Sequence, residues 1–288
     1  MPSSTVELGM SLITAGPNRA STHTHRSDRV TAILDRLAAD GSVNAAGVAT
    51  DLGVSVATIR RDLSLLDEQN LLTRTHGGAV ARDVAYELPV RYRDSRGRSQ
   101  KQAIARMALR SLPCGPHVVA INGGTTTSEV ARLLATRTDL TVVTNALNIA
   151  SVLVNRPRVK LVVTGGVARS NSYELVGPWA EGTVGRVNVD TAFVGIDGIS
   201  AASGLSTHDE IEAHINAVMI RQARRVVVVA DGSKIGRTRL AHVVGLDAVD
   251  ELVTDSTADG GELAAIAARG VRVRIADSPV SRSAESAG

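Results

Sequence analysis

The second half of the sequence alternates β-branched runs with helical segments, and this alternation constrains the fold more than any other feature. The first run is HVVAI at residues 117–121 and the last is VRVRIAD at residues 271–277. Between them, helical patterns recur, for example from about residue 209 to residue 223. Strands that alternate with helices form parallel sheets with helices packed on their faces. We therefore expect residues 101–277 to form one Rossmann-like, mostly parallel α/β domain.

The segment before this domain has a helical period instead. Apolar residues between Val30 and Leu37 predict a first helix that ends at Asp40-Gly41. Asn44 and Ser55 are candidate caps for two further helices. The third helix is expected to bury Val56, Ile59, Leu63 and Leu66.

A β-wing is predicted after the third helix. Residues 71–74 (LLTR) have a strand pattern, and His76-Gly77-Gly78 supplies a turn. Helices followed by a wing in this order predict a winged helix-turn-helix domain over residues 27–81.

The third helix also has the polar residues that a recognition helix needs. Such a helix presents side chains of its first turns to base edges, and hydroxyl and amide groups to phosphates. An arginine pair alone is more typical of a solvated helix face, and the surrounding sequence is what favours recognition here. The candidates are Ser55, Thr58, Arg60 and Arg61.

Three segments lack either pattern. Residues 1–26 and 278–288 are expected to be disordered tails, because they are rich in small polar residues and have no apolar period. Residues 82–100 belong to a strongly basic stretch and are expected to link the two domains.

Composition excludes several classes of function. Aromatic residues make up only 2% of the chain, which argues against stacking platforms for single-stranded nucleic acid. The one cysteine, Cys114, allows no internal disulfide and no cysteine-rich zinc site, and we expect neither metal nor cofactor. Without a long apolar run or a signal-peptide pattern, the chain is expected to be cytoplasmic and to have no membrane partner.

One strand-to-helix junction has the composition of an anion site. Residues 121–127 (INGGTTT) place glycines and hydroxyl groups where the amide groups of a helix start attract anions. A simple turn and cap would have the same composition, and the lysine of a P-loop is missing. Further polar residues follow other strands, where ligands bind in such sheets: Asn145, Gly165, Gly166, Asp197, Asp231 and Lys234.

Both regions resemble one known family. Residues 52–79 (LGVSVATIRRDLSLLDEQNLLTRTHGGA) resemble the DNA-binding domain of DeoR-type bacterial regulators of sugar metabolism. The motifs GGTTT, TNAL, TGG, GxDG, GLSTHDE and ADGSKIG resemble the effector domain of the same family, in the same order. Together the matches cover about residues 28–256. The resemblance implies an effector domain similar in fold to ribose-phosphate isomerase, and a phosphorylated sugar as effector.

The resemblance also implies roles for individual residues. It assigns base and phosphate contacts to the helix that starts at Ser55 and backbone contacts to Arg74 and His76, whereas Asp62 is expected to pair with an arginine. The expected phosphate ligands are Gly124, Thr125, Thr126, Thr127 and Lys234. The residues expected near the sugar are Asn145, Asp197, His208, Glu210 and Asp231. Asn122, Gly123, Gly165 and Gly166 complete the expected effector site.

Two positions depart from related patterns. Many family members have aspartate where this chain has Asn122, and the histidine that follows GxDG in the similar deaminase is replaced by Ile199. The missing histidine argues against an enzyme. The resemblance implies a regulator instead: a repressor of a sugar-catabolism operon that a phosphorylated sugar releases. The alternative is a sugar-phosphate isomerase or deaminase with an appended DNA-binding domain, in which Asp197 or Glu210 is the general base.

The expected partners are double-stranded operator DNA and a second copy of the chain. The DNA-binding domain is formally neutral, with seven arginines and seven acidic residues between Arg26 and Arg82, which disfavours a sequence-independent nucleoid protein. Two half-sites require at least a dimer, so we expect a homodimer or tetramer.

Overall fold

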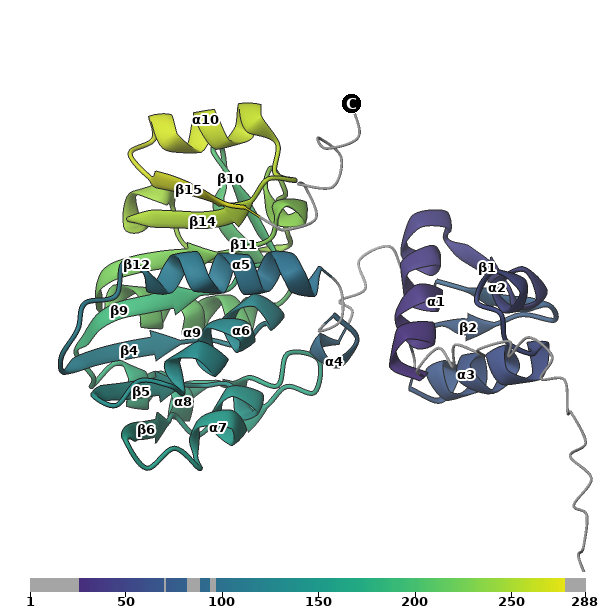
Figure 1. The fold of residues 1–288 in the computed structure, drawn as a ribbon, viewed down its shortest axis with the longest axis horizontal. Coiled ribbons are helices and arrows are strands. Elements are labelled where there is room, and N and C mark those ends of the chain that lie inside the picture. The colour runs from purple at the N-terminus through teal and green to yellow at the C-terminus, as the bar shows by residue number, and fades with distance from the viewer. Residues whose placement is uncertain (1–25, 70, 82–88, 94–96, 278–288) are drawn as a thin grey trace, which may run out of the picture.

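The computed structural model describes residues 26–69, 71–81, 89–93 and 97–277. A smaller N-terminal domain lies beside a larger C-terminal one (Figure 1). The expected tails fall outside the described residues, except for Arg26, and so does much of the expected linker. The domain boundaries stay a prediction.

The N-terminal domain is the predicted winged helix-turn-helix. Its helices are α1 (Arg26–Asp40), α2 (Ala45–Asp51) and α3 (Val56–Glu68), and its sheet has the antiparallel order β1-β3-β2, formed by β1 (Ser42–Asn44), β2 (Thr73–Arg74) and β3 (Gly78–Val80). Asn44 accepts hydrogen bonds from two amides of α2, and the Ser55 side chain accepts one from the amide of Thr58. Both predicted caps are confirmed.

Two details of the prediction were wrong. Val56 is 37% exposed, because the first residue of α3 lies outside the face that packs on the core. The buried pair Leu71-Leu72 precedes the wing strand, which is limited to Thr73–Arg74. Sequence reasoning also missed β1, which is too short for an alternating pattern to show.

The C-terminal domain is built on one seven-stranded sheet, and every pairing in it is parallel. Its order is β15-β14-β12-β9-β4-β5-β6. The strands are β4 (His117–Ile121), β5 (Leu140–Thr144), β6 (Val159–Val163), β9 (Val189–Val194), β12 (Ala223–Val229), β14 (Glu251–Asp255) and β15 (Arg272–Ala276). The β-branched runs are therefore the strands that the sequence predicts.

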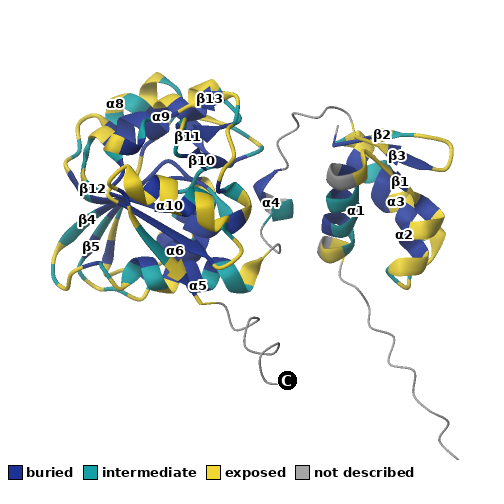
Figure 2. Cartoon of the chain, turned by 90° about the horizontal axis from the view of Figure 1, so that it is seen from above, coloured by how far each residue is buried: buried dark blue, intermediate teal, exposed yellow. Residues whose placement is uncertain are grey.

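Helices cover both faces of this sheet. One apolar cluster joins the sheet to α5 (Arg98–Leu109), α6 (Thr125–Leu134) and α7 (Leu147–Leu153), and the other joins it to α8 (Pro178–Val184), α9 (Glu210–Arg221) and α10 (Gly260–Ala268). Alternate residues of β4 belong to alternate clusters: Val119 and Ile121 to the first, and Ala120 to the second. The sheet is consequently buried between its helix layers (Figure 2).

Several short elements have no clear sequence signal. A ribbon is formed by β7 (Val167–Ala168) and β8 (Leu175–Val176), and a small antiparallel sheet by β10 (Gly198–Ser200), β11 (Gly204–Thr207) and β13 (Ala241–His242). The 3-10 turns are η1 (Gly232–Lys234) and η2 (Leu246–Ala248). A short helix, α4 (Val90–Arg93), lies within the segment expected to be a linker.

The sheet order fixes where a ligand can enter. From β4 the chain proceeds outward through β5 and β6, and then returns to the other side of β4 to form β9. Loops that leave the carboxyl ends of β4 and β9 therefore diverge and open a crevice between them, which is the usual binding position in open α/β sheets.

Candidate effector pocket and DNA interface

A cavity of about 350 Å³ opens at this crevice. Its walls come from the loops that follow β4, β9, β12 and β14, together with α4 and the start of α5. A cavity of this volume is within the range of small-molecule sites. Segments that are far apart in the sequence thus meet at one place in the fold.

The start of α6 forms the floor of the cavity. Gly124 caps this helix with φ +141°, a conformation that L side chains rarely adopt. Gly123 is equally constrained, because an added Cβ would lie 2.6 Å from the side chain of Glu174. These glycines let Thr125 and Thr126 line the cavity at the helix N-terminus, where first-turn amides and the helix dipole favour an anion.

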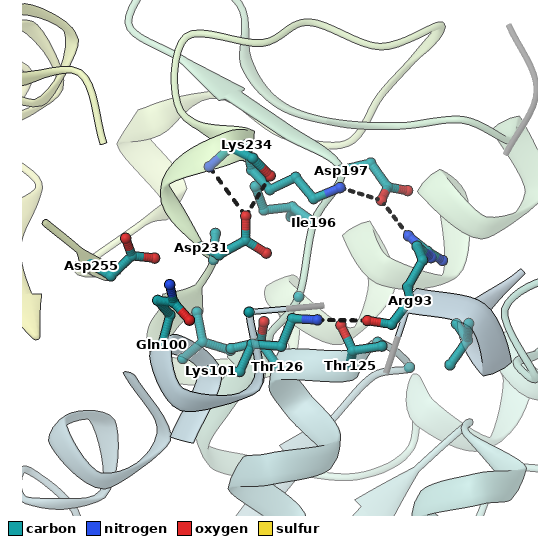
Figure 3. A pocket seen from close by; sticks show the side chains of 18 of the residues that line it. Arg93, Gln100, Lys101, Thr125, Thr126, Ile196, Asp197, Asp231, Lys234 and Asp255 are labelled. Atoms are coloured by element: carbon teal, nitrogen blue, oxygen red, sulfur yellow. Dashed lines mark hydrogen bonds and ion pairs between the residues drawn. The ribbon is translucent and has the colours of Figure 1, made fainter. Parts of the chain in front are cut away.

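Three cationic side chains surround the same space. Arg93 comes from α4, Lys101 from α5 and Lys234 from η1. Arg93 Nη1 donates to Asp197 Oδ1 at 2.9 Å, and Lys234 Nζ lies 3.5 Å from the same oxygen. Lys101 Nζ donates to the carbonyl of Arg93 at 2.7 Å. Figure 3 shows Arg93 and Lys234 converging on Asp197.

Asp197 is the buried carboxylate at the centre of this group, with 5% of its surface exposed. Burial alone would raise its pKa, but the charge of Arg93, followed by those of Lys234 and His208, holds the pKa of Asp197 well below its usual value. The Thr207 hydroxyl also donates to Oδ2 at 3.0 Å. Asp197 is therefore ionised at neutral pH.

Glu174 has the opposite character. It is buried behind the β4–α6 loop and accepts a hydrogen bond from the amide of Gly123. Burial, and then repulsion from Glu212, raise the pKa of Glu174 well above its usual value. The Gly123 amide is therefore occupied by an acceptor within the protein. Through this bond Glu174 holds the β4–α6 loop in place.

Seven of the predicted effector residues line the cavity: Gly123, Gly124, Thr125, Thr126, Asp197, Asp231 and Lys234. They come from three different strand ends. Three of the residues named after other strands, Asp197, Asp231 and Lys234, are among them, whereas Asn145, Gly165 and Gly166 are not.

Other predicted residues lie behind the cavity wall. Asn122 is buried and bonds both backbone groups of Gly195, while Thr127 is buried and donates to the Gly124 carbonyl. Asn145 is buried and donates to the carbonyl of Leu175. These side chains hold the loops in place, and the cavity lining does not include them.

The last group of predicted residues is outside the lining as well. Gly165 and Gly166 follow β6, the strand at the sheet edge, where positive φ values let the chain turn. Glu210 is exposed at the start of α9. His208 contributes to the pocket in that its charge helps to lower the pKa of Asp197. Neither the position of a residue after a strand nor its place in a motif predicted whether its side chain faces the cavity.

Sequence reasoning missed several lining residues, among them Arg93, Gln100, Lys101 and Glu212. The first three lie before the first strand of the sheet, where no strand-end rule applies. Their one signal was the basic stretch at residues 82–110, which suggests a linker and a helix. Glu212 lies two residues after the GLSTHDE motif and forms an ion pair with Arg169.

The predicted recognition surface is on α3. Ser55, Arg60 and Arg61 are exposed, and Thr58 is half-buried with its hydroxyl 2.8 Å from Ser55 Oγ. Asp62 faces inward and receives two hydrogen bonds from Arg29, as the sequence predicts. The arginine pair is thus directed outward while the next residue fastens α3 to α1.

The wing residues differ from each other. His76 is exposed at the turn. Arg74 is half-buried, and its Nη1 donates to Ser64 Oγ at 2.5 Å, so it ties the wing to α3. Arg74 thus helps to fix the orientation of α3 relative to the wing.

The described residues contain neither a membrane-spanning helix nor a metal cluster. None of their helices combines the length and the apolar character needed to cross a membrane. They also contain no group of three or more histidine, cysteine, aspartate or glutamate residues placed to hold a metal ion.

Known proteins match both domains. Residues 29–84 match the DeoR-like helix-turn-helix domain, and residues 97–256 match the DeoR C terminal sensor domain. An HTH-type transcriptional regulator GlpR of Haloferax volcanii is 39% identical over 223 residues, which cover 77% of this chain and 87% of the relative. The glycerol-3-phosphate regulon repressor of Escherichia coli K12 is 31% identical over 231 residues, covering 80% and 91%.

Solved structures add little to the assignment. The chain spans about half the length of ribose 5-phosphate isomerase A from Methanocaldococcus jannaschii, with 46% and 52% of the two chains covered, 18% identity and a TM-score of 0.35. A TM-score this low leaves the fold to be judged from the topology itself. The domain models and the relatives, which span most of this chain, are decisive: the chain belongs to the DeoR family of transcription regulators.

Proposed function

We propose that this chain is a repressor of a sugar-catabolism operon, and that a phosphorylated sugar releases it from its DNA operator. The observation that carries this proposal is the pocket, in which three cations and a helix N-terminus meet buried carboxylates. Cations and a helix N-terminus bind phosphate, and carboxylates accept hydrogen bonds from sugar hydroxyl groups. A relative that represses a glycerol-3-phosphate regulon supports the same class of function.

The pocket has two chemically different ends in this proposal. The phosphate group binds at the start of α6, with Thr125, Thr126 and Lys234 around it. Asp197 and Asp231 accept hydrogen bonds from the sugar hydroxyl groups. An unphosphorylated sugar cannot make the first set of interactions and is expected to bind much more weakly.

A binding role is favoured over catalysis of isomerisation or deamination. Ile199, at the position of the deaminase histidine, is buried within the small sheet of β10 and carries no titratable group. The low pKa of Asp197 also makes this carboxylate a weak general base at neutral pH. Both features suit a sensor that binds its ligand and returns it unchanged.

Isothermal titration calorimetry with a panel of pentose and hexose phosphates tests the pocket directly. One compound is expected to bind, its unphosphorylated form is not, and Lys234→Met is expected to weaken binding by roughly 10- to 100-fold, the value of a charge-assisted hydrogen bond. Recovery of the compound unchanged separates a sensor from an enzyme. Failure of every compound to bind, or conversion of one, would contradict the proposal.

The oligomeric state and the location are part of the proposal. A dimer or tetramer would place two recognition helices on successive half-sites of the operator, in the cytoplasm where that DNA lies. Sedimentation velocity is expected to show a species larger than the 30.0 kDa chain at micromolar concentration. A strict monomer bound tightly to the operator would contradict this part.

A further inference from the structure

Helix α4 contacts both domains through adjacent residues. Tyr92 belongs to the N-terminal side: its ring packs against the core of the DNA-binding domain, and its hydroxyl donates to Gln69 Oε1 at 2.5 Å. Gln69 is the C-cap of α3 and directly follows its last residue, Glu68. Thr31 of α1 also donates to the carbonyl of Tyr92, at 3.3 Å. Tyr92 is therefore attached to two helices of the domain that binds DNA.

The next residue, Arg93, belongs to the effector pocket. Its guanidinium donates to Asp197, its carbonyl accepts from Lys101, and its side chain is only 18% exposed. At the other end of α4, the amide of Val90 donates to the carbonyl of Asn171 at 2.8 Å. Consecutive Cα atoms are about 3.8 Å apart, so α4 cannot shift at Arg93 without shifting Tyr92.

Two of the three pocket cations share one acceptor. Arg93 and Lys234 both contact Oδ1 of Asp197 (Figure 3). A phosphate dianion at the start of α6 would offer these cations a second partner with more negative charge. Arg93 could bind the phosphate only by weakening or rearranging its bond to Asp197. This bond is one of those that hold α4 on the sensor domain.

We infer, resting on the proposed function, that Arg93 is the residue through which the sensor pocket sets the affinity for operator DNA. In the ligand-free protein, the Arg93–Asp197 bond docks α4 and Tyr92 fixes the DNA-binding domain in the orientation that fits the operator. A phosphorylated sugar engages Arg93, α4 leaves this position, and the affinity for the operator falls. Because coupling is reciprocal, operator DNA lowers the affinity for the sugar phosphate by the same factor.

The test measures operator affinity without any ligand, by fluorescence anisotropy on the duplex DNA upstream of the protein's own gene. Asp197→Asn removes the charge that holds Arg93 and keeps the size of the side chain. Tyr92→Phe removes only the hydroxyl that bonds Gln69 and leaves the pocket intact. Both are expected to weaken operator binding, within the range of about 5- to 150-fold that is typical of coupling between sites.

Glu251→Gln is the matched control. Glu251 is a buried carboxylate that also contacts two cations, Arg225 and Arg274, but it lies at the first residue of β14, away from the strand end that lines the pocket. It is expected to bind the operator like the wild type. Thermal unfolding of each variant shows whether it is folded, and Tyr92→Phe is the variant least able to disturb the fold.

A second readout uses the ligand. Tyr92→Phe is expected to bind the sugar phosphate found by calorimetry with unchanged affinity, while the sugar phosphate changes its operator affinity less than in the wild type. If the wild type responds to a sugar phosphate and Tyr92→Phe responds equally, the role of Arg93 is refuted and the proposed function stands. If no sugar phosphate binds but Asp197→Asn and Tyr92→Phe still weaken operator binding, the proposed effector class fails and the role of α4 stands. Equal operator affinity in all variants, or an equal loss in Glu251→Gln, overturns the inference.

Discussion

Helices α3 and α4 both carry arginines, but their surroundings give these arginines different roles. Arg60 and Arg61 on α3 are exposed to solvent. Arg93 on α4 is mostly buried and donates to an ionised carboxylate in a cavity. An exposed guanidinium can bind bases or phosphates of DNA. A guanidinium already bonded to a carboxylate can instead respond to an anionic ligand that competes with this carboxylate.

The difference shows that residue type alone does not predict the role of an arginine here. Asp62 lies beside Arg61 in sequence, yet its side chain is buried against Arg29, and Arg61 is directed away from it. Asp197 reaches Arg93 across 104 positions of sequence. The geometry of α3 orients Arg60 and Arg61, whereas the fold of the whole sensor domain orients Arg93.

The largest effect is expected from Arg60→Ala combined with Arg61→Ala. Removing a side chain that hydrogen-bonds a base edge costs about 1 to 3 kcal/mol of operator binding, so the double variant is weakened by roughly twice as much if both side chains reach base edges. Sugar-phosphate binding is expected to stay unchanged, because α3 does not line the pocket. Anisotropy and calorimetry on the same preparations check both statements, and wild-type operator affinity in the double variant would refute the recognition surface.

A smaller effect on stability is expected from Asp62→Asn. Asp62 receives two charge-assisted hydrogen bonds from Arg29, at 2.9 and 3.3 Å. Asparagine keeps one acceptor oxygen but loses the charge and the second acceptor, and this loss is expected to lower the free energy of unfolding of the N-terminal domain by about 1.5 to 3 kcal/mol. Urea denaturation measures the change, with the exposed Asp67→Asn as control. Equal stability of the two variants would show that the Arg29–Asp62 pair does not hold α3.

The smallest effects are expected from the pH dependence of two buried carboxylates, Asp197 and Glu174, and they have opposite signs. The pKa of Asp197 is lowered on folding, so its stabilising contribution is present above its unfolded pKa of about 3.9 and is lost as the pH falls. Asp197→Asn is therefore expected to lower Tm at neutral pH, by an amount that shrinks on acidification.

The pKa of Glu174 is raised on folding, so stability is lost as the pH rises above its unfolded pKa of about 4.3. Glu174→Gln is expected to raise Tm relative to the wild type at neutral pH and to have little effect in acid. Calorimetric scans over a pH series measure both variants, and the same sign of pH dependence for both would contradict the assigned environments.

Sequence patterns predict the elements of this protein better than its pocket. The caps Asn44 and Ser55 act within a few residues of themselves, and the parallel strands are visible as β-branched runs. The pocket depends on which loops meet, and sheet order brings Lys234 and Asp197 together with the start of α6. No local pattern could show that Arg93 reaches Asp197, because that contact depends on how α4 packs on the sensor domain.

The central claim is that a ligand in the sensor pocket controls DNA binding by α3. Fluorescence anisotropy of the operator complex tests it most directly, at two salt concentrations to separate specific from non-specific binding, with a panel of sugar phosphates and their unphosphorylated forms. The account predicts sequence-selective binding that one phosphorylated sugar releases and its unphosphorylated form does not. Operator binding that no sugar phosphate alters would contradict it.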